Sequence, residues 1–177
     1  MQKQKCVFLD RDGVLNRELG DYAYRLDHFE VLPRVPEALA LLKQHGFLLI
    51  VITNQSGISK GIFQRADMEA CHRKLQDTCN QLIDDIYFAP GHQTISASLS
   101  RKPDSLMLEK AIAKYNIDPN LSWMVGDVPR DIAAGLKAGV RTIMVGGRHQ
   151  PADAHTLEAE DLWEAAQLIL AETKKPA

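Results

Sequence analysis

Short apolar runs alternate with amphipathic helical patterns along the chain, and this alternation sets the class of fold. The run LLIVI at residues 48–52 is rich in β-branched residues, which predicts a buried strand. Four shorter apolar runs predict further strands, at residues 6–9, 86–88, 123–125 and 142–145. Strands separated by helices form βαβ units, so we predict an α/β fold with a doubly wound parallel sheet and helices on both faces.

The helical patterns between these strands have recognisable ends. Pro36 suits the first position of a helix that stops before Gly46. A longer helix is predicted over residues 64–82, where apolar residues recur at three- and four-residue spacing. Asp104 is a candidate N-cap for the helix that follows it. Two more helices are predicted, at residues 131–138 and at about residues 157–172.

The composition is that of an ordinary globular protein. The chain has 177 residues, 45% of them hydrophobic and 25% charged, with a net charge of −2, which predicts a single domain over residues 1–177. The near-neutral balance gives no basic surface for nucleic acid or for an anionic membrane. No apolar stretch has the length of a signal-peptide core or a membrane span, and the three cysteines lack metal-ligand spacing. We therefore predict a monomeric cytoplasmic protein with reduced thiols.

Polar motifs stand where the predicted strands end or the next helix begins. They are DRDG from Asp10, TNQSG from Thr53, RKPD from Arg101 and GDVPRD from Gly126. Each alone is a common loop composition. Ligands of open parallel sheets bind at the carboxyl ends of the strands, so the joint occurrence of the four motifs predicts one site there.

The residue types in these motifs match the requirements of phosphoryl transfer. Such a reaction needs a nucleophile, a metal ion that neutralises phosphate charge, further donors to the phosphate oxygens and a group that handles the leaving-group proton. Asp10 is a candidate nucleophile, and Asp10 with Asp127 can bind Mg²⁺. Thr53 offers a hydroxyl, Lys102 offers a cation, and Asp12 can act as general acid and base.

The four motifs resemble those of the haloacid dehalogenase (HAD) superfamily. FLDRDG, VITNQSG, RKP and VGDVPRD match its motifs in order, and the resemblance covers a core of residues 6–147. DRDGVLN, TNQSGI followed by KGIF, and RKP are most similar to the D-glycero-D-manno-heptose-1,7-bisphosphate phosphatases, whose near relatives are the histidinol-phosphate phosphatases. The resemblance implies a Rossmann-like core and a phosphatase of small metabolites.

The resemblance also implies individual roles. Asp10 would be the nucleophile, and Asp12 would be the acid and base and would also offer its backbone carbonyl to the metal ion. Asp127 would bind Mg²⁺, and Asp131 would support the metal site without binding the ion. Thr53 and Lys102 would stabilise the phosphoryl group. The substrate contacts would include Asn54, Gln55, Ser56 and Arg101.

The type of reaction depends on Asp12. Superfamily members that transfer the phosphoryl group differently, such as the transport ATPases, resemble this pattern but have threonine at that position. An acid and base there favours hydrolysis. We therefore predict a Mg²⁺-dependent phosphomonoester hydrolase that acts through an aspartyl phosphate, with heptose 1,7-bisphosphate as its substrate.

The spacing of the motifs predicts a capless enzyme. Many relatives carry a cap domain after the first or second motif, but residues 13–52 and 57–100 are too short to hold another core. Loops would then form the walls of the site. We predict that these walls are residues 16–27, with Glu18 and Tyr22 as substrate contacts, and residues 89–101.

The second loop departs from the family pattern. The heptose bisphosphatases commonly bind a structural zinc there through three cysteines and a histidine. This chain has Ala89 and Gly91 near the first two ligand positions, no cysteine after them, and His92 alone, so we predict no zinc. Val128 also stands where some relatives place a lysine that contacts substrate. Both departures leave the exact sugar and its anomer open.

Three alternatives remain beside the heptose bisphosphatase. The first is a histidinol-phosphate phosphatase or another small phosphomonoesterase. The second is a phosphoacceptor domain of the receiver type, although receivers place the acidic pair and the phosphorylated aspartate on different strands. The third is a catalytically silent binding protein, although no motif residue is missing.

Overall fold

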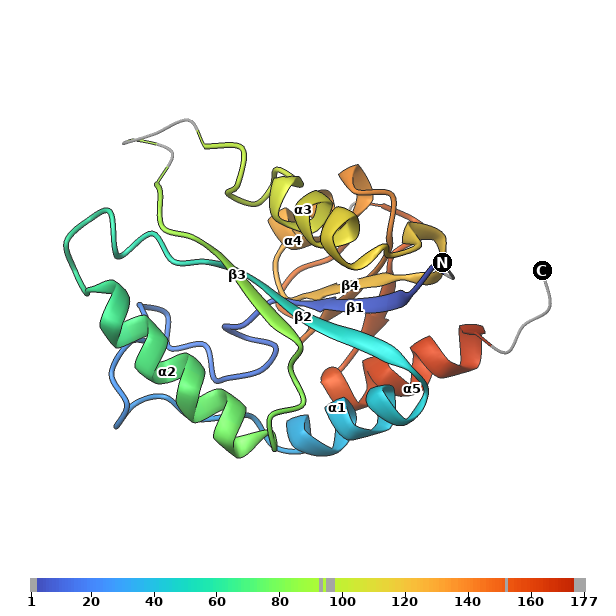
Figure 1. Ribbon diagram of the computed structural model, residues 1–177, viewed down its shortest axis with the longest axis horizontal. Helices are drawn as coiled ribbons and strands as arrows, with labels where there is room; N and C mark the ends of the chain where they lie inside the picture. The colour runs from blue at the N-terminus through green and yellow to red at the C-terminus, as the bar shows by residue number, and fades with distance from the viewer. Residues whose placement is uncertain (1–2, 93, 95–97, 152, 174–177) are drawn as a thin grey trace.

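Six parallel strands form one sheet in the computed structural model, which describes residues 3–92, 94, 98–151 and 153–173 (Figure 1). The strand order across the described part of the sheet is β3-β2-β1-β4-β5-β6. The strands are β1 (Lys5–Leu9), β2 (Phe47–Asn54), β3 (Asp85–Ala89), β4 (Trp123–Gly126), β5 (Arg141–Val145) and β6 (Leu157–Ala159). The predicted doubly wound α/β class is confirmed.

Helices cover both faces of the sheet, as Figure 1 shows. One face carries α1 (Val35–Gln44), α2 (Arg65–Thr78) and α5 (Leu162–Thr173). The other carries α3 (Leu106–Tyr115) and α4 (Pro129–Lys137), and a short 3-10 helix, η1 (Pro119–Leu121), precedes β4. Among the described residues, no helix is both long enough and apolar enough to cross a membrane.

The alternation of side chains along β1 explains why both faces need cover. Val7 and Leu9 belong to the hydrophobic cluster under α1 and α5, whereas Cys6 and Phe8 belong to the cluster under α3. All four side chains are 0% exposed, as expected for a central parallel strand. Burial of both faces fixes the register of β1, so the turn that follows Leu9 is held in one place.

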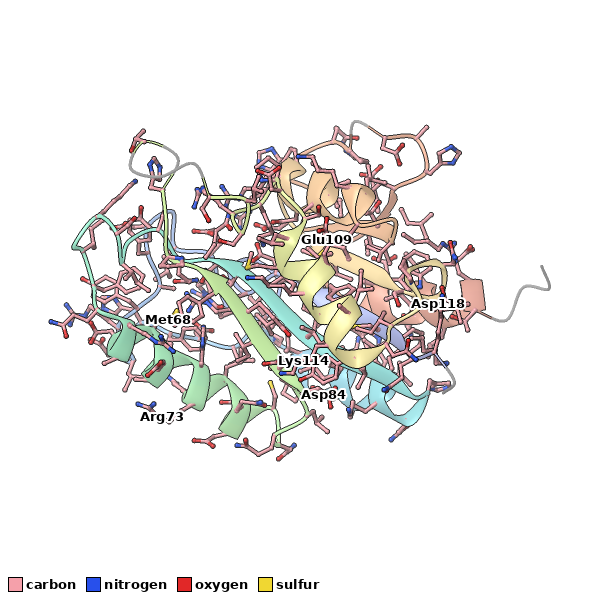
Figure 2. All side chains as sticks on the ribbon, turned by 45° about the horizontal axis from the view of Figure 1, so that its top comes forward. Met68, Arg73, Asp84, Glu109, Lys114 and Asp118 are labelled. Carbon is pink, nitrogen blue, oxygen red and sulfur yellow. The ribbon has the colours of Figure 1, made fainter. Side chains whose placement is uncertain are left out.

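α2 lies with one side against the core and the other toward solvent. In Figure 2 the side chain of Arg73 extends outward from this helix, whereas Met68 is buried on its inner side. The helix ends at Thr78, four residues before the predicted end. Asn80 and Gln81 adopt positive φ angles of 52° and 58°, which a helix cannot continue through.

The prediction of a C-terminal helix from about residue 157 was wrong at its start. Residues Leu157–Ala159 form β6, which pairs with β5, and the helix begins only at Leu162. Leu157 and Ala159 alternate with the exposed Glu158, which is the two-residue period of an edge strand. Three residues with a central glutamate are too short and too polar to be recognised as a strand from sequence.

The N-cap prediction for α3 was also wrong. Ser105, not Asp104, occupies the position before the helix. The Asp104 carboxylate instead accepts a 2.8 Å hydrogen bond from Lys137 of α4. This long-range partner is invisible to a pattern of neighbouring residues.

Candidate active site

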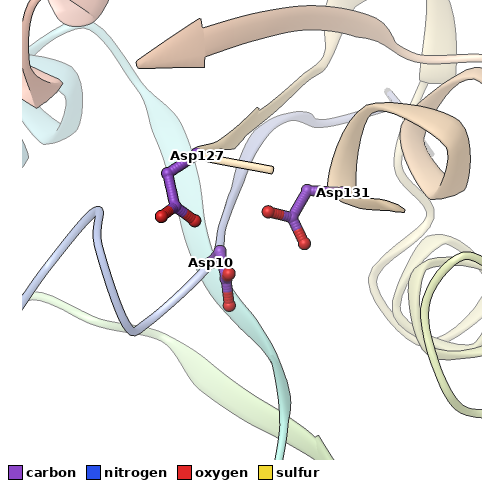
Figure 3. A group of neighbouring side chains, drawn as sticks. All are labelled: Asp10, Asp127 and Asp131. Carbon is purple, nitrogen blue, oxygen red and sulfur yellow. The ribbon is translucent and has the colours of Figure 1, made fainter. Parts of the chain in front are cut away.

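Three carboxylates from separate parts of the chain converge at the carboxyl ends of β1 and β4. Asp10 follows β1, Asp127 follows β4, and Asp131 lies in the first turn of α4 (Figure 3). One carboxylate oxygen of each lies within 4.8 Å of the others. They meet because β1 and β4 are hydrogen-bonded neighbours in the sheet.

Burial disfavours the ionised form of these three carboxyl groups when no cation is bound between them. Asp10, Asp127 and Asp131 are all nearly inaccessible to solvent. Burial and the nearby Asp131 raise the pKa of Asp10 well above its usual range. Burial, Asp131 and Glu18 raise the pKa of Asp127 to about 6. Carboxyl groups whose ionised form is disfavoured this strongly indicate a site built for a cation.

Lys102 supplies one positive charge to the group. Its Nζ atom lies 2.8 Å from Asp10 Oδ1 and 2.8 Å from Asp131 Oδ1, and it donates a 2.7 Å hydrogen bond to the Ile52 carbonyl oxygen. Burial lowers the pKa of Lys102, but the two carboxylates outweigh burial and raise it, so the side chain is an ammonium ion. One ammonium cannot balance three carboxylates.

The rest of the site fits a Mg²⁺ ion. Asp131 Oδ1 is buried and accepts no hydrogen bond from the described residues, even though Lys102 Nζ is close. Gly13 has a φ of +85°, and a Cβ atom there would lie 2.2 Å from Asp127 Oδ2, so only glycine leaves room for the carboxylate. A few carboxylate oxygens with space for water and phosphate are the surroundings that Mg²⁺ prefers.

The Asp12 carboxylate is not part of the group of three and is bound by neighbouring side chains. Its oxygens accept hydrogen bonds from Arg11 Nη2 at 2.9 and 3.1 Å, from Asn16 Nδ2 at 2.9 Å and from Gln55 Nε2 at 3.1 Å. Metal binding by Asp12 through its backbone carbonyl stays a prediction. Asp131 was predicted to support the metal site without binding the ion; its carboxylate lies in the group that could share one ion, and its role stays a prediction.

Arg11 was missed as a site residue by the sequence analysis. Its side chain is completely buried, and besides Asp12 it donates to the Ala23 carbonyl oxygen at 2.8 Å. The guanidinium also lies over the Phe29 ring, 5.5 Å from its centroid. Arg11 therefore joins the turn of the DRDG motif to the loop that begins at Asn16.

His72 of α2 lies against Arg11. We predict that protonation of its ring makes the stability of the fold depend on pH. Arg11 Nη1 lies 3.4 Å from His72 Nε2. Burial and the charge of Arg11, opposed by Asp12 and Glu69, lower the pKa of His72 from 6.5 to about 4. Below about pH 6.5 the imidazole of His72 is protonated in the unfolded chain but still neutral in the native protein. Because the unfolded chain then binds more protons, the free energy of unfolding should fall by up to about 3 kcal/mol between about pH 6.5 and pH 4.

The measurement is urea unfolding of the wild type and of His72→Gln between pH 7 and pH 4.5. We expect the free energy of unfolding to fall more steeply with decreasing pH in the wild type than in the variant. Subtracting the two curves removes the contributions of all other titrating groups. Parallel curves would contradict the prediction.

A cavity of about 340 Å³ opens beside Asp10 and Asp12. It is lined by every predicted substrate contact: Glu18, Tyr22, Asn54, Gln55, Ser56 and Arg101. Both predicted wall loops therefore reach it, although residues 93 and 95–97 of the second loop lie outside the described residues. The lining agrees with the prediction, while binding by these residues stays untested.

The TNQSG motif holds the catalytic candidates in place. Asn54 Nδ2 donates to the Lys102 carbonyl oxygen at 3.1 Å, and the Lys102 backbone N–H donates to Asn54 Oδ1 at 3.0 Å. Gln55 Nε2 donates to Thr53 Oγ1 at 2.8 Å in addition to Asp12. Thr53 itself is fully buried at the end of β2. These contacts make the motif a frame for Lys102 and Asp12 as well as a cavity wall.

Three basic residues of the cavity were not predicted as substrate contacts: Lys60, His92 and Arg130. Lys60 stands in the KGIF segment, which entered the sequence analysis only as part of a resemblance. Arg130 was quoted within GDVPRD without a role. Their position depends on how loops and α4 pack, which periodicity does not report.

This fold and site define a hydrolase of the HAD type. Residues 99–167 match the family model described as HAD-hydrolase-like. Asp10 and Asp12 share one turn after β1, whereas a receiver domain has its acidic pair and its phosphorylated aspartate on different strands. The sheet, the capless cavity and the match are those of a HAD-like phosphatase.

Proteins with similar sequences identify the particular family within this class. The chain is 32% identical to the D-glycero-D-manno-heptose-1,7-bisphosphate 7-phosphatase of Chlorobaculum tepidum, over 93% of this chain and 94% of the relative. It is 40% identical to the D-glycero-β-D-manno-heptose-1,7-bisphosphate 7-phosphatase of Pasteurella multocida, over 80% and 82%. The chain belongs to the D-glycero-D-manno-heptose-1,7-bisphosphate 7-phosphatase family.

A solved structure has the same architecture. The D,D-heptose 1,7-bisphosphate phosphatase from B. bronchiseptica, complexed with magnesium and phosphate, superposes with a TM-score of 0.89 at 30% identity. The match covers 96% of this chain and 99% of that one. That relative binds the metal and the anion for which the site described above has the appropriate charges.

Proposed function

We propose that this phosphatase removes the 7-phosphate from D-glycero-D-manno-heptose 1,7-bisphosphate with Mg²⁺ as cofactor. The observation that carries the proposal is the group of Asp10, Asp127 and Asp131 around Lys102 at one end of the cavity. The family relatives named above support the choice of sugar. The fit of the carboxylates to Mg²⁺ supports the choice of cofactor.

Asp10 has the surroundings of a nucleophile. One carboxylate oxygen attacks phosphorus, the bond from phosphorus to the sugar oxygen breaks, and an aspartyl phosphate forms. Lys102 balances the charge that gathers on the phosphoryl oxygens. Mg²⁺, held by Asp10, Asp127 and Asp131, would neutralise phosphate charge when bound. The backbone N–H of Arg11 donates a 2.7 Å hydrogen bond to Asp10 Oδ1, which helps to orient the carboxylate.

Asp12 lies next to the same cavity and handles protons. In its protonated form it gives a proton to the departing sugar oxygen. It then takes a proton from the water that attacks the aspartyl phosphate, and inorganic phosphate leaves. The donors on Arg11, Asn16 and Gln55 fix the position of its carboxylate for the second step.

Phosphate release from a panel of substrates tests the proposal. The panel contains both anomers of heptose 1,7-bisphosphate, histidinol phosphate and 4-nitrophenyl phosphate, each with Mg²⁺ and with EDTA. We expect a heptose anomer to exceed the other compounds in kcat/KM by on the order of a hundredfold, and activity to disappear in EDTA. Comparable rates on all compounds would contradict the choice of substrate, and a preference for histidinol phosphate would establish the alternative.

Asp127→Asn is expected to weaken the binding of Mg²⁺. The amide keeps the shape of the side chain but removes a negative charge from the metal site, so the Mg²⁺ concentration for half-maximal rate should rise by about tenfold or more. The measurement is a Mg²⁺ titration of the rate. Asp77→Asn, on an exposed part of α2, is the control and should keep the wild-type curve. An unchanged curve for Asp127→Asn would remove this residue from the metal site.

Three further properties belong to the proposal. They are that the protein is a monomer, that it acts in the cytoplasm, and that it binds neither zinc nor nucleic acid. The net charge of −2 supports the last of these for nucleic acid. For zinc, Ala89 and Gly91 at the expected ligand positions support it.

A further inference from the structure

The first wall loop, residues 16–27, has a tip that backbone hydrogen bonds do not hold. Within residues 18–24, no backbone N–H or carbonyl oxygen bonds to the backbone of another described residue. Tyr22 and Ala23 of this tip nevertheless line the cavity. A segment with so few backbone partners needs side-chain contacts to keep one position, and two sets of such contacts are present.

The first set comes from Arg11, which binds the tip and the Asp12 carboxylate with the same nitrogen atom. Nη2 donates to the Ala23 carbonyl oxygen at 2.8 Å, and also to Asp12 Oδ1 at 2.9 Å and Oδ2 at 3.1 Å. Since Arg11 is fully buried, solvent does not compete for these hydrogen bonds. A shift of Ala23 therefore shifts the guanidinium, and with it the donors that orient Asp12.

The second set is a cluster of three aromatic rings beside the tip. Tyr24 stacks on Phe63 with ring centroids 5.0 Å apart and an interplanar angle of 9°, and the Tyr22 ring lies 5.7 Å from Phe63 at 58°. Both arrangements are favourable for aromatic pairs. Phe63 fits there because residue 57 is glycine, since a Cβ atom on Gly57 would lie 2.1 Å from Phe63 Cε1. The rings thus hold the chain on both sides of Ala23.

The rings reach the chemistry only through the tip. Neither Phe63 nor Tyr24 is among the described residues that line the cavity. Phe63 is 5% exposed, so its contacts are with protein atoms. The rings fix the backbone around Ala23, the Ala23 carbonyl oxygen holds Arg11, and Arg11 holds Asp12. This series of contacts connects a buried phenylalanine outside the cavity to the predicted acid and base.

We propose that Arg11 and Phe63 are positioning residues for Asp12. Phe63 holds the tip of the first wall loop, and Arg11 transmits the position of the tip to the Asp12 carboxyl group. The inference rests on the role of Asp12 in the proposed function, but not on the choice of sugar. Transfer of a proton to the departing oxygen depends strongly on distance and direction, so a displaced tip slows the reaction of esters that need an acid.

The test uses two esters of nearly equal size that differ in how much they need an acid. Phenoxide is a far more basic leaving group than 4-nitrophenoxide, so phenyl phosphate depends on protonation much more than 4-nitrophenyl phosphate does. kcat/KM is measured for both esters with Mg²⁺ present. In Phe63→Leu we expect kcat/KM for phenyl phosphate to fall by about tenfold or more, while that for 4-nitrophenyl phosphate stays within about twofold.

Variants at Tyr24 and a matched control distinguish positioning from general stability. Tyr24→Leu should lower the ratio of phenyl to 4-nitrophenyl phosphate, whereas Tyr24→Phe keeps the stacked ring and should keep the wild-type ratio. Phe47→Leu also shortens a buried phenylalanine, but at the start of β2, the opposite end of that strand from Thr53. It should lower the thermal midpoint and keep the ratio. A ratio for Phe63→Leu within about twofold of wild type, or an equal fall in Phe47→Leu, would overturn the inference.

Asp12→Asn separates this inference from the proposed function. Because this variant has no acid, it should show the lowered ratio most strongly. If Asp12→Asn lowers the ratio and Phe63→Leu does not, the inference fails while the role of Asp12 stands. If Asp12→Asn keeps the wild-type ratio, the role of Asp12 as acid fails, and the inference fails with it.

A double substitution tests the path through Arg11. Arg11→Met removes the donors to Asp12 and to Ala23, so it should lower the ratio by itself. Adding Phe63→Leu to it should change the ratio by no more than about twofold, because the path is already broken. Effects that multiply would overturn the assigned path. Arg11→Lys keeps the charge but has one nitrogen for three acceptors, and it serves in the same way if Arg11→Met does not fold.

Discussion

Replacing Asp10 with asparagine is expected to lower kcat by about 10⁴-fold or more while the protein stays folded. An amide oxygen is a poor nucleophile toward phosphorus, and the substitution also removes a negative charge from the metal site. We expect no other carboxylate to replace it, because Asp127 follows β4, Asp131 lies in α4 and Asp12 is held by Arg11.

The stability of Asp10→Asn should be unchanged or higher, although its kcat falls. The raised pKa of Asp10 means that its ionised form is disfavoured in the native state, so a neutral side chain relieves repulsion with Asp131. We expect the thermal midpoint of Asp10→Asn without Mg²⁺ to equal or exceed that of the wild type. Activity within about tenfold of wild type would remove Asp10 as nucleophile. A large loss of both activity and midpoint would show that the side chain acts through the fold.

Lys102→Met is expected to be the most destabilising of these substitutions, by about 3–5 kcal/mol. It leaves Asp10 and Asp131 buried without the ammonium that lies 2.8 Å from each, and it removes the hydrogen bond to Ile52. Catalysis should be lost as well, because nothing then balances the phosphoryl oxygens on that side.

Mg²⁺ gives this prediction a specific control. A divalent cation replaces part of the missing charge, so added Mg²⁺ should stabilise Lys102→Met more than it stabilises the wild type. The measurement is urea unfolding with and without Mg²⁺, and Lys110→Met, at an exposed position of α3, is the matched control. Wild-type stability for Lys102→Met, or an equal effect of Mg²⁺ on both proteins, would contradict the assigned role.

Much of this architecture could be predicted because its causes are local. The apolar runs of β1 and β2 are buried on both faces, so their sequences have the β-branched and aliphatic character of central strands. β6 was missed because an edge strand with Glu158 at its centre has no such character. The end of α2 was misplaced because Asn80 and Gln81 turn the chain with positive φ angles that side-chain periodicity does not report.

Some residues of the candidate site could also be predicted from the sequence, and others could not. Asp10, Asp12 and Asp127 could be predicted, because a parallel sheet brings the residues that follow its strands to one edge. Arg11 was missed because its contacts with Ala23 and His72 come from distant parts of the sequence, and the place of Arg130 in the cavity wall depends on how α4 packs. Asp131 was identified, yet its place beside Asp10 depends on how α4 packs.

The position of β1 in the sheet has a consequence for how the protein is made. β1 leaves the ribosome before the other five strands of the described sheet, but one of its two neighbours, β4, is synthesised only after α3. Until then β1 has one open hydrogen-bonding edge, and Asp10 has neither Asp127 nor Asp131 beside it. A nascent chain that stops before β4 therefore has Asp10 but lacks the other two carboxylates of the group, which is complete only when α4 has been synthesised.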